Sequence, residues 1–198
     1  AAGARSWGDV LDEHVPGRWR QETLTVNYRT PSEVMDTAAG ALAAIDAQVR
    51  PPTSVRSTGV RPWVRPVGSR TLADAVAEAT AAEADAVAPG NVAVIVSAAD
   101  LDSVYAALAA AMPSAVSRVD NSTTLDWPVT VLTVAQVKGL EFDAVVVVEP
   151  AQIMADSARG ATDLYVALTR PTQRLGIVHA QALPDVLDPA TLEVRDGA

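Results

Sequence analysis

Three short segments of the chain place charged or aromatic side chains beside apolar runs: Leu24–Pro31, Thr133–Asp143 and Asp163–Leu175. Each falls where the hydrophobic pattern predicts that a strand meets a loop or a helix. Residues at such junctions are held by a rigid scaffold and are the ones that commonly reach a ligand. These segments therefore hold the candidates for a binding or catalytic site.

The residues best suited to chemistry are two arginines, Arg29 and Arg170, which have few acidic residues near them in sequence. A guanidinium offers a planar fork of donors that binds phosphate oxygens in pairs. Arginines from a second domain commonly stabilise the charge that develops in phosphoryl transfer. The two residues indicate contact with a nucleotide phosphate. The alternative for a single arginine is a surface salt bridge.

The sequence has no phosphate-cradling G-x-x-x-x-G-K-[ST] loop, because its only lysine, Lys138, precedes Gly139 and follows no glycine-rich run. The chain is therefore predicted to contact a nucleotide without holding it alone, as half of an ATPase. The isolated chain is expected to hydrolyse no ATP. A start at Ala1 without methionine is also typical of a piece of a longer protein.

Predicted strands and helices alternate, which indicates a doubly wound α/β domain at residues 21–182. Continuous aliphatic runs favour parallel strands that are covered on both faces. Residues 1–20 are predicted to be irregular, and residues 183–198 to be a tail with little core material. Asp100 is expected to cap a helix. The predicted strands are 22–27, 63–67, 92–96, 129–134, 144–148 and 175–179, and the helices are 34–49, 72–88, 101–112 and 161–169.

The composition of the 198 residues excludes several classes of protein. A hydrophobic content of 49% is too high for a disordered chain. No cysteine is present and no secretion signal or spanning apolar run is visible, so a cytoplasmic protein without membrane contact is expected. His14 and His179 lie too far apart in sequence to indicate a metal site.

The net charge of −9 argues against general affinity for nucleic acid, which needs a positive field. Between Asp46 and Asp74, however, the chain is basic. One interpretation is a local contact with a polyanion, and the other is a solvated connector rich in proline and arginine. The residues proposed for a polyanion contact are Arg56, Arg61, Trp63 and Arg65.

Three motifs resemble motifs IV, V and VI of superfamily-1 UvrD/Rep-type helicases: Asn27-Tyr28-Arg29, Lys138–Asp143 and Tyr165–Arg170. Their order and their placement at junctions match as well. The resemblance extends from Thr23 to about His179 and concerns the second RecA-like domain. It implies a mainly parallel sheet with helices on both faces. A first domain with the P-loop, the Mg²⁺-binding acidic residues and the general base would lie upstream.

The resemblance implies a role for each matching residue in binding ATP with Mg²⁺ in the parent protein. Tyr28 would stack on adenine, Arg29 would reach the terminal phosphate, and Arg170 would be an arginine finger. Glu141 would accept a hydrogen bond from the ribose. Lys138 and Gly139 would form the turn into a short helix, where Gly139 serves backbone geometry. Alternatively, Tyr28 packs under its loop and Glu141 pairs with an arginine of its own domain.

Two departures from DNA-translocating relatives point to a branch of this superfamily. Ala135 stands where those relatives carry a histidine, and the stretch between Arg29 and Thr133 is too short for their large inserted subdomain. Both features resemble HelD-type ATPases, which bind and recycle RNA polymerase. Arg5-Ser6-Trp7 and Pro16–Trp19 also resemble that branch, and the arginine and alanine content is typical of high-GC bacteria.

Two other functions stay open at the level of sequence. The first is the same domain in a DNA-translocating UvrD-like repair helicase. The second is a catalytically silent interaction module that has kept the fold and lost the motor. For a HelD-like or a UvrD-like parent, one expected partner is the P-loop domain of the same parent protein. The other expected partner is RNA polymerase or nucleic acid.

Overall fold

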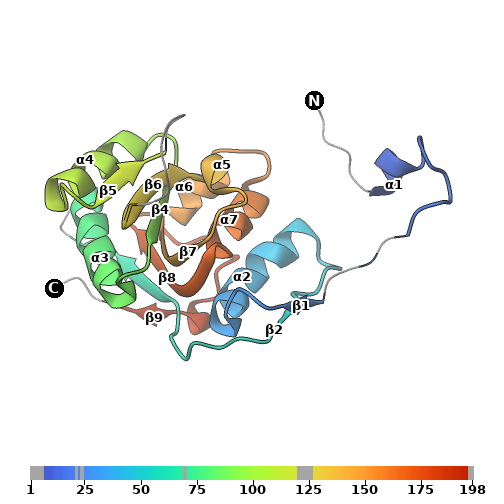
Figure 1. The fold of residues 1–198 in the computed structure, drawn as a ribbon, viewed down its shortest axis with the longest axis horizontal. Coiled ribbons are helices and arrows are strands. Elements are labelled where there is room, and N and C mark those ends of the chain that lie inside the picture. Colours follow the sequence, from blue (N-terminus) through green and yellow to red (C-terminus); the bar gives the residue numbers. More distant parts are fainter. Residues whose placement is uncertain (1–6, 21, 23–24, 69–70, 120–126, 196–198) are drawn as a thin grey trace.

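The computed structural model describes residues 7–20, 22, 25–68, 71–119 and 127–195 (Figure 1). The helices are α1 (Trp7–Leu11), α2 (Ser32–Ile45), α3 (Leu72–Val87), α4 (Leu101–Ala111), α5 (Val134–Val137), α6 (Pro150–Ala155), α7 (Gly160–Leu168) and the 3-10 turn η1 (Pro189–Thr191). The strands are β1 (Val26–Asn27), β2 (Thr53–Ser54), β3 (Trp63–Pro66), β4 (Val92–Val96), β5 (Val116–Arg118), β6 (Val129–Thr133), β7 (Phe142–Val148), β8 (Pro171–His179) and β9 (Glu193–Val194).

Seven of the described strands form one sheet in the order β5-β6-β4-β7-β8-β3-β9. Every neighbouring pair in that sheet is parallel. Parallel strands need crossover connections, which the intervening helices provide. The prediction of a mainly parallel, doubly wound α/β sheet is therefore confirmed. The short strands β1 and β2 pair separately, also in parallel.

Two helical layers cover the two faces of the sheet, and strand β4 shows how they are separated. Val92, Val94 and Val96 point into the core beneath α3 and α4. Ala93 and Ile95 point into the core shared with α2, α5, α6 and α7. All five β4 residues are buried, as the uninterrupted apolar run predicts for a central parallel strand.

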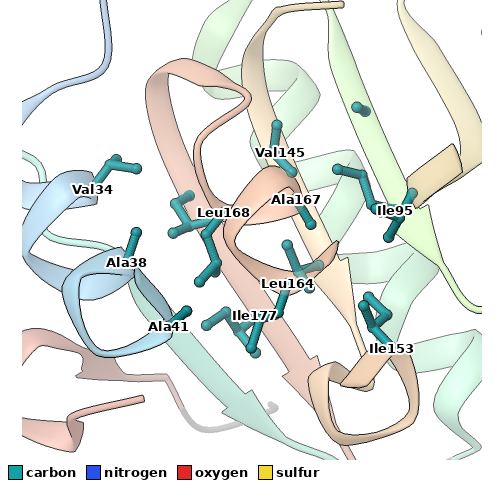
Figure 2. Packing of buried hydrophobic residues seen from close by; sticks show 14 of the residues in the cluster. Val34, Ala38, Ala41, Ile95, Val145, Ile153, Leu164, Ala167, Leu168 and Ile177 are labelled. Carbon is teal, nitrogen blue, oxygen red and sulfur yellow. The ribbon is translucent and has the colours of Figure 1, made fainter. Parts of the chain in front are cut away.

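The second of these cores holds the helices that carry the candidate site. In Figure 2, Val34, Ala38 and Ala41 of α2 face Leu164 and Leu168 of α7, and all five are fully buried. Small alanines on α2 let the two helices approach closely. Burying a side chain such as Leu168 contributes about 1.5–3 kcal/mol. The packing fixes the start of α2 and the end of α7 relative to one another.

Several local predictions need correction. Residues 1–20 include helix α1, which stands away from the sheet in Figure 1. Strands β2 and β5 and helix α6 are absent from the elements that the sequence predicts. Asp100 makes no side-chain cap, because its carboxylate instead accepts a hydrogen bond from Ser97 Oγ at 2.8 Å.

The C-terminal segment is also more than a tail. Leu187 and Leu192 are buried in the core against α2 and β8. Strand β9 pairs in parallel with β3, matching Trp63 with Glu193 and Val64 with Val194. The prediction of a tail failed because only a few apolar residues of this segment pack into the core, and so few residues give a weak signal in the sequence.

Within the described residues, no helix is long and apolar enough to span a membrane.

Candidate functional site

The register of two neighbouring strands brings Glu141 and Arg170 together. Phe142 of β7 is opposite Pro171 of β8, and the Phe142 amide donates to the Arg170 carbonyl at 3.2 Å. Glu141 and Arg170 immediately precede these two strands. Because the strands are parallel, both residues emerge at the edge of the sheet where β7 and β8 begin. We call this the amino edge.

Arg29 reaches the same edge from a loop that follows β1. The Asn27 side chain accepts hydrogen bonds from the amides of Arg29 at 2.9 Å and Thr30 at 3.2 Å, which forms an Asx turn. Arg56 Nη1 donates to the Arg29 carbonyl at 3.3 Å. The pairing of β1 with β2 and these side-chain bonds together set the path of the loop.

Glu33, near the start of α2, fixes the segment that follows β2. Its carboxylate accepts hydrogen bonds from Ser57 Oγ at 2.5 Å, the Gly59 amide at 2.8 Å and the Thr58 amide at 3.4 Å. Burial would raise the pKa of Glu33, but these hydrogen bonds outweigh it and lower that pKa to about 2. The segment that carries Arg56 is thus tied to α2.

A pocket of 420 Å³ lies at the amino edge. It combines two guanidinium groups, two tyrosine rings and one carboxylate. The residues that line it are Val26, Asn27, Tyr28, Arg29, Thr30, Met35, Glu141, Tyr165, Thr169 and Arg170. The structure therefore brings four of the predicted nucleotide residues, Tyr28, Arg29, Glu141 and Arg170, into one pocket.

The two arginines of the pocket are held in different ways. Arg29 forms an ion pair with Glu141, and its side chain is 66% exposed. Arg170 is half-buried, and its guanidinium donates to the Val166 carbonyl at 3.0 Å and to Thr169 Oγ1 at 3.2 Å. Burial lowers the pKa of Arg170, Glu141 opposes that effect and the positive charge of Arg29 adds to it.

The aromatic residues of the pocket also differ in their surroundings. Tyr28 is 73% exposed, so the alternative in which it packs under its loop is wrong. Tyr165 is partly buried against the core. Burial raises the pKa of the Tyr165 hydroxyl, while the charge of Arg170 opposes that rise. The exposed ring of Tyr28 is free to stack on a flat ligand.

Lys138 and Gly139 do not line the pocket. Lys138 Nζ pairs with Asp163 of α7 at 3.2 Å. Gly139 adopts φ +86°, a left-handed conformation that glycine tolerates best, so it serves the backbone. The predicted order of elements needs correction, because the short helix α5 precedes these residues. They form the turn that leaves α5 and enters β7.

The structure contradicts the polyanion contact predicted for the arginine-rich segment. Trp63 is buried, and its indole N–H donates to Glu83 at 2.8 Å. Arg65 is largely buried and pairs with Glu78 at 3.4 Å. Arg61 donates to the carbonyl of Ala190, and Arg56 supports the Arg29 loop. Strand β3 carries Trp63 and Arg65 into the fold, so these two side chains are not presented at the surface to a polyanion.

Sequence reasoning missed Glu33 and the positioning role of Arg56. The available signals were weak: an acidic residue in the first turn of a helix and one arginine among several. Neither signal reveals a partner more than twenty residues away. Arg5 and Ser6, quoted for the HelD resemblance, lie outside the described residues.

A second pocket, of 190 Å³, lies at the opposite edge of the sheet, where β4 and β6 end. Thr133 and Ala135 line it together with the carboxylates of Asp156 and Asp163. Burial would raise the pKa of Asp163, but Ser157 and Lys138 outweigh it and lower that pKa. In the described residues, no group of three His, Cys, Asp or Glu side chains could hold a metal ion.

Comparisons with known proteins place these features in context. Residues 128–178 match the family model described as the UvrD-like helicase C-terminal domain. No protein among the curated sequences matches the chain. The solved C-terminal domain of a possible DNA helicase from Lactobacillus plantarum WCFS1 superposes with a TM-score of 0.64 at 22% identity. That match covers 85% of this chain and 98% of the other.

Two further structures align less closely. A complex of Arterivirus nonstructural protein 10 (helicase) with DNA has a TM-score of 0.47 at 15% identity, over 83% of this chain and 37% of that chain. The UvsW helicase from bacteriophage T4 has a TM-score of 0.48 at 12% identity, over 69% of this chain and 54% of that chain.

The parallel sheet, its two helical layers and the structural match define a RecA-like α/β domain of the kind found at the C-terminus of helicases. Within that fold, residues 128–178 are similar to the UvrD-like helicase C-terminal domain. The matched residues include Glu141 and Arg170, which both line the pocket at the amino edge.

Proposed function

We propose that this chain is the second motor domain of a helicase-like ATPase. In that role it supplies Arg29 and Arg170 to the triphosphate of an ATP held by a P-loop domain of the same parent protein. One observation carries the proposal: both guanidinium groups line one pocket beside an exposed tyrosine ring. If Arg29 and Arg170 lay on different faces of the sheet, they could not bind the same triphosphate.

The chemistry of the pocket suits a nucleoside triphosphate. Arg170 and Arg29 would bind phosphate oxygens and stabilise the negative charge that develops as the terminal phosphoryl group is transferred. Tyr28 would stack on the base, and Glu141 would accept a hydrogen bond from a ribose hydroxyl. Mg²⁺ would neutralise phosphate charge when bound, through ligands of the P-loop domain.

This division of the site between two domains couples hydrolysis to motion. The triphosphate would bridge the P-loop domain and the two arginines of this chain. Once the terminal phosphate leaves, the contacts that hold the two domains together weaken and the cleft opens. The well-packed pair of α2 and α7 would transmit that movement to the rest of the domain as a rigid unit.

The decisive experiment is steady-state ATPase activity of the full-length parent with Arg170→Ala. Loss of an arginine finger is expected to lower turnover by roughly 10³-fold. Arg159→Ala is a matched control, because Arg159 lies at the other end of α7, is exposed and does not line the pocket. Near-normal turnover in Arg170→Ala would overturn the proposal.

We further propose that the parent is a HelD-like ATPase that binds RNA polymerase. Support comes from Ala135, which removes a polar contact from the pocket at the other edge of the sheet, and from Asp156, an acidic residue in the same pocket. Negative charge there opposes a phosphate backbone. The chain between β2 and β6 also leaves no room for a large inserted subdomain.

A DNA-translocating UvrD-like parent is the second candidate, because residues 128–178 match that family. The two candidates differ in what stimulates the ATPase. A DNA motor should be stimulated by single-stranded DNA with steep salt dependence. A HelD-like parent should retain RNA polymerase in a pull-down without such stimulation. A silent interaction module is disfavoured by the shared pocket of Arg29, Glu141 and Arg170.

A further inference from the structure

The pocket at the amino edge contains an internal anion. Among the described residues that line it, Glu141 supplies the carboxylate, and this carboxylate is bound to Arg29. Arg29 is also the more exposed of the two arginines, so it is the one that an incoming ligand meets first. In the ligand-free domain the cation most accessible to a phosphate is therefore already paired.

Arg170 is in a different condition. Its hydrogen bonds go to neutral acceptors, the carbonyls of Val166 and Leu140 and the hydroxyl of Thr169. These bonds orient the guanidinium without neutralising its charge. Glu141 still acts on it electrostatically, because the carboxylate and Arg29 have opposite effects on the pKa of Arg170. One carboxylate thus influences both cations of the pocket.

We propose that Glu141 competes with phosphate for Arg29, so that a triphosphate binds this domain only by exchanging places with the Glu141 carboxylate. The inference rests on the proposed function and adds a regulatory step to it. Glu141 is 32% exposed and can turn toward solvent or toward a ribose hydroxyl when it releases Arg29. After phosphate leaves, the carboxylate recaptures Arg29 and favours opening of the cleft.

The physical basis is the low strength of an exposed ion pair. Such a pair contributes little in water, so a ligand with several phosphate charges can displace it. The same carboxylate repels phosphate while it remains in the pocket. The open domain should therefore bind anions weakly, and removing the charge of Glu141 should strengthen binding by about threefold to fivefold at low ionic strength.

The experiment measures binding of inorganic tripolyphosphate to the 198-residue chain by isothermal titration calorimetry at low salt. Glu141→Gln is expected to bind about threefold to fivefold more tightly than the unmodified chain. The same substitution in an Arg29→Ala background should have a smaller effect, of no more than about twofold, because only the direct repulsion between the carboxylate and phosphate remains. Unchanged or weaker binding in Glu141→Gln would overturn the proposal.

A matched control removes the same charge from a different ion pair. Asp102→Asn breaks the Arg118–Asp102 contact on α4, which belongs to the opposite helical layer. It should leave tripolyphosphate binding within about twofold, since Asp102 does not line the pocket. An effect as large as that of Glu141→Gln would show that net charge alone is responsible and would also overturn the proposal.

A second readout does not depend on anion binding. Phenylglyoxal modifies arginine side chains, and an arginine held in an ion pair reacts more slowly. Peptide mapping should show faster modification of Arg29 in Glu141→Gln, with Arg170 changed less. Equal rates at Arg29 in the two proteins would contradict the exchange.

Failure of this inference is distinguishable from failure of the proposed function. If Glu141→Gln has no effect on tripolyphosphate while Arg170→Ala abolishes ATP turnover in the parent, the exchange is refuted and the motor role stands. If the exchange is observed while Arg170→Ala retains turnover, the motor role is refuted and the exchange stands.

Discussion

The ion clusters around Glu83 and Glu141 both join a glutamate to arginine, and they differ in burial and in the number of donors that the carboxylate binds. Glu83 is 2% exposed and accepts hydrogen bonds from Trp63, Arg174 and Arg195 at 2.6–3.2 Å. Glu141 lies beside a pocket and pairs with an arginine that is mostly exposed. The first cluster connects α3, β3 and β8 with Arg195, which follows β9, whereas the second faces solvent.

The difference separates a structural ion cluster from one suited to a ligand. Burial would raise the pKa of Glu83, but the hydrogen bond and charge of Arg174, with Trp63 and Arg195, outweigh it and lower that pKa. Arg195 also lies over the Trp63 ring at 5.0 Å from its centroid. Arg174 and Arg195 therefore stabilise the fold and are not available to bind a ligand. Arg29 and Arg170 instead line a pocket that is open to solvent.

The largest expected effect on stability follows from removing the buried carboxylate. Glu83→Ala should lower the free energy of unfolding by about 3–5 kcal/mol, because Arg174, Arg195 and the buried indole N–H of Trp63 all lose the carboxylate that they share. Urea denaturation followed by circular dichroism measures the change. Glu141→Ala is the matched control and should lose less than about 1 kcal/mol. Equal losses would erase the distinction between the two clusters.

A somewhat smaller effect is expected at Gly176, which supports the buried cluster from β8. A methyl group at this position would overlap the ring of Trp63 on the neighbouring strand. Gly176→Ala should therefore destabilise the domain by about 1–3 kcal/mol. Combining it with Trp63→Ala should give a loss smaller than the sum of the two single losses, measured by urea denaturation. Additive losses would contradict the contact.

The third prediction concerns Glu33, which holds the loop of Ser57–Gly59 without an arginine. Its pKa of about 2 lies below the ordinary value of 4.5, so its contribution to stability is present above pH 4.5 and is lost as pH falls toward 2. After allowance for solvent screening this contribution is about 1 kcal/mol. Glu33→Gln should flatten that part of a pH–stability curve. An unchanged curve would contradict the role of the carboxylate.

The smallest effect on stability is expected at Arg29, one of the two arginines proposed to bind phosphate. Arg29→Ala removes an exposed ion pair and should change the free energy of unfolding by no more than about 0.5 kcal/mol. Thermal unfolding by differential scanning calorimetry would detect a larger change. A loss comparable to that of Glu83→Ala would place Arg29 in the structural group and weaken its assignment to a ligand.

Much of the fold could be predicted because the central strands are continuous aliphatic runs. Val92–Val96 is a strand with the predicted bounds, and Ala144–Val148 forms most of β7. Strand β3 was predicted despite its flanking prolines. In contrast, β5 has only three residues and β9 only two, and strands this short give no periodic signal. Their positions depend on β6 and β3, the strands with which they pair at the two ends of the sheet.

The candidate site was predictable as a set of residues but not as a set of contacts. Arg29, Glu141 and Arg170 were chosen from separate motifs, and the pocket that joins them depends on the register of β7 with β8. The arginine-rich segment was misinterpreted for the same reason. The partner of Trp63 lies on a different element, at Glu83, and sequence alone does not indicate that contact.

The pairing of β9 with β3 has a practical consequence for the handling of this domain. Glu193 and Arg195 donate backbone hydrogen bonds to Pro62 and Val64, which occupies one side of β3. A truncation after Leu192 would leave those carbonyls unpaired, and an uncovered strand is a template for a second chain. Shortened versions would self-associate and precipitate even though every residue of the pocket at the amino edge remained in place.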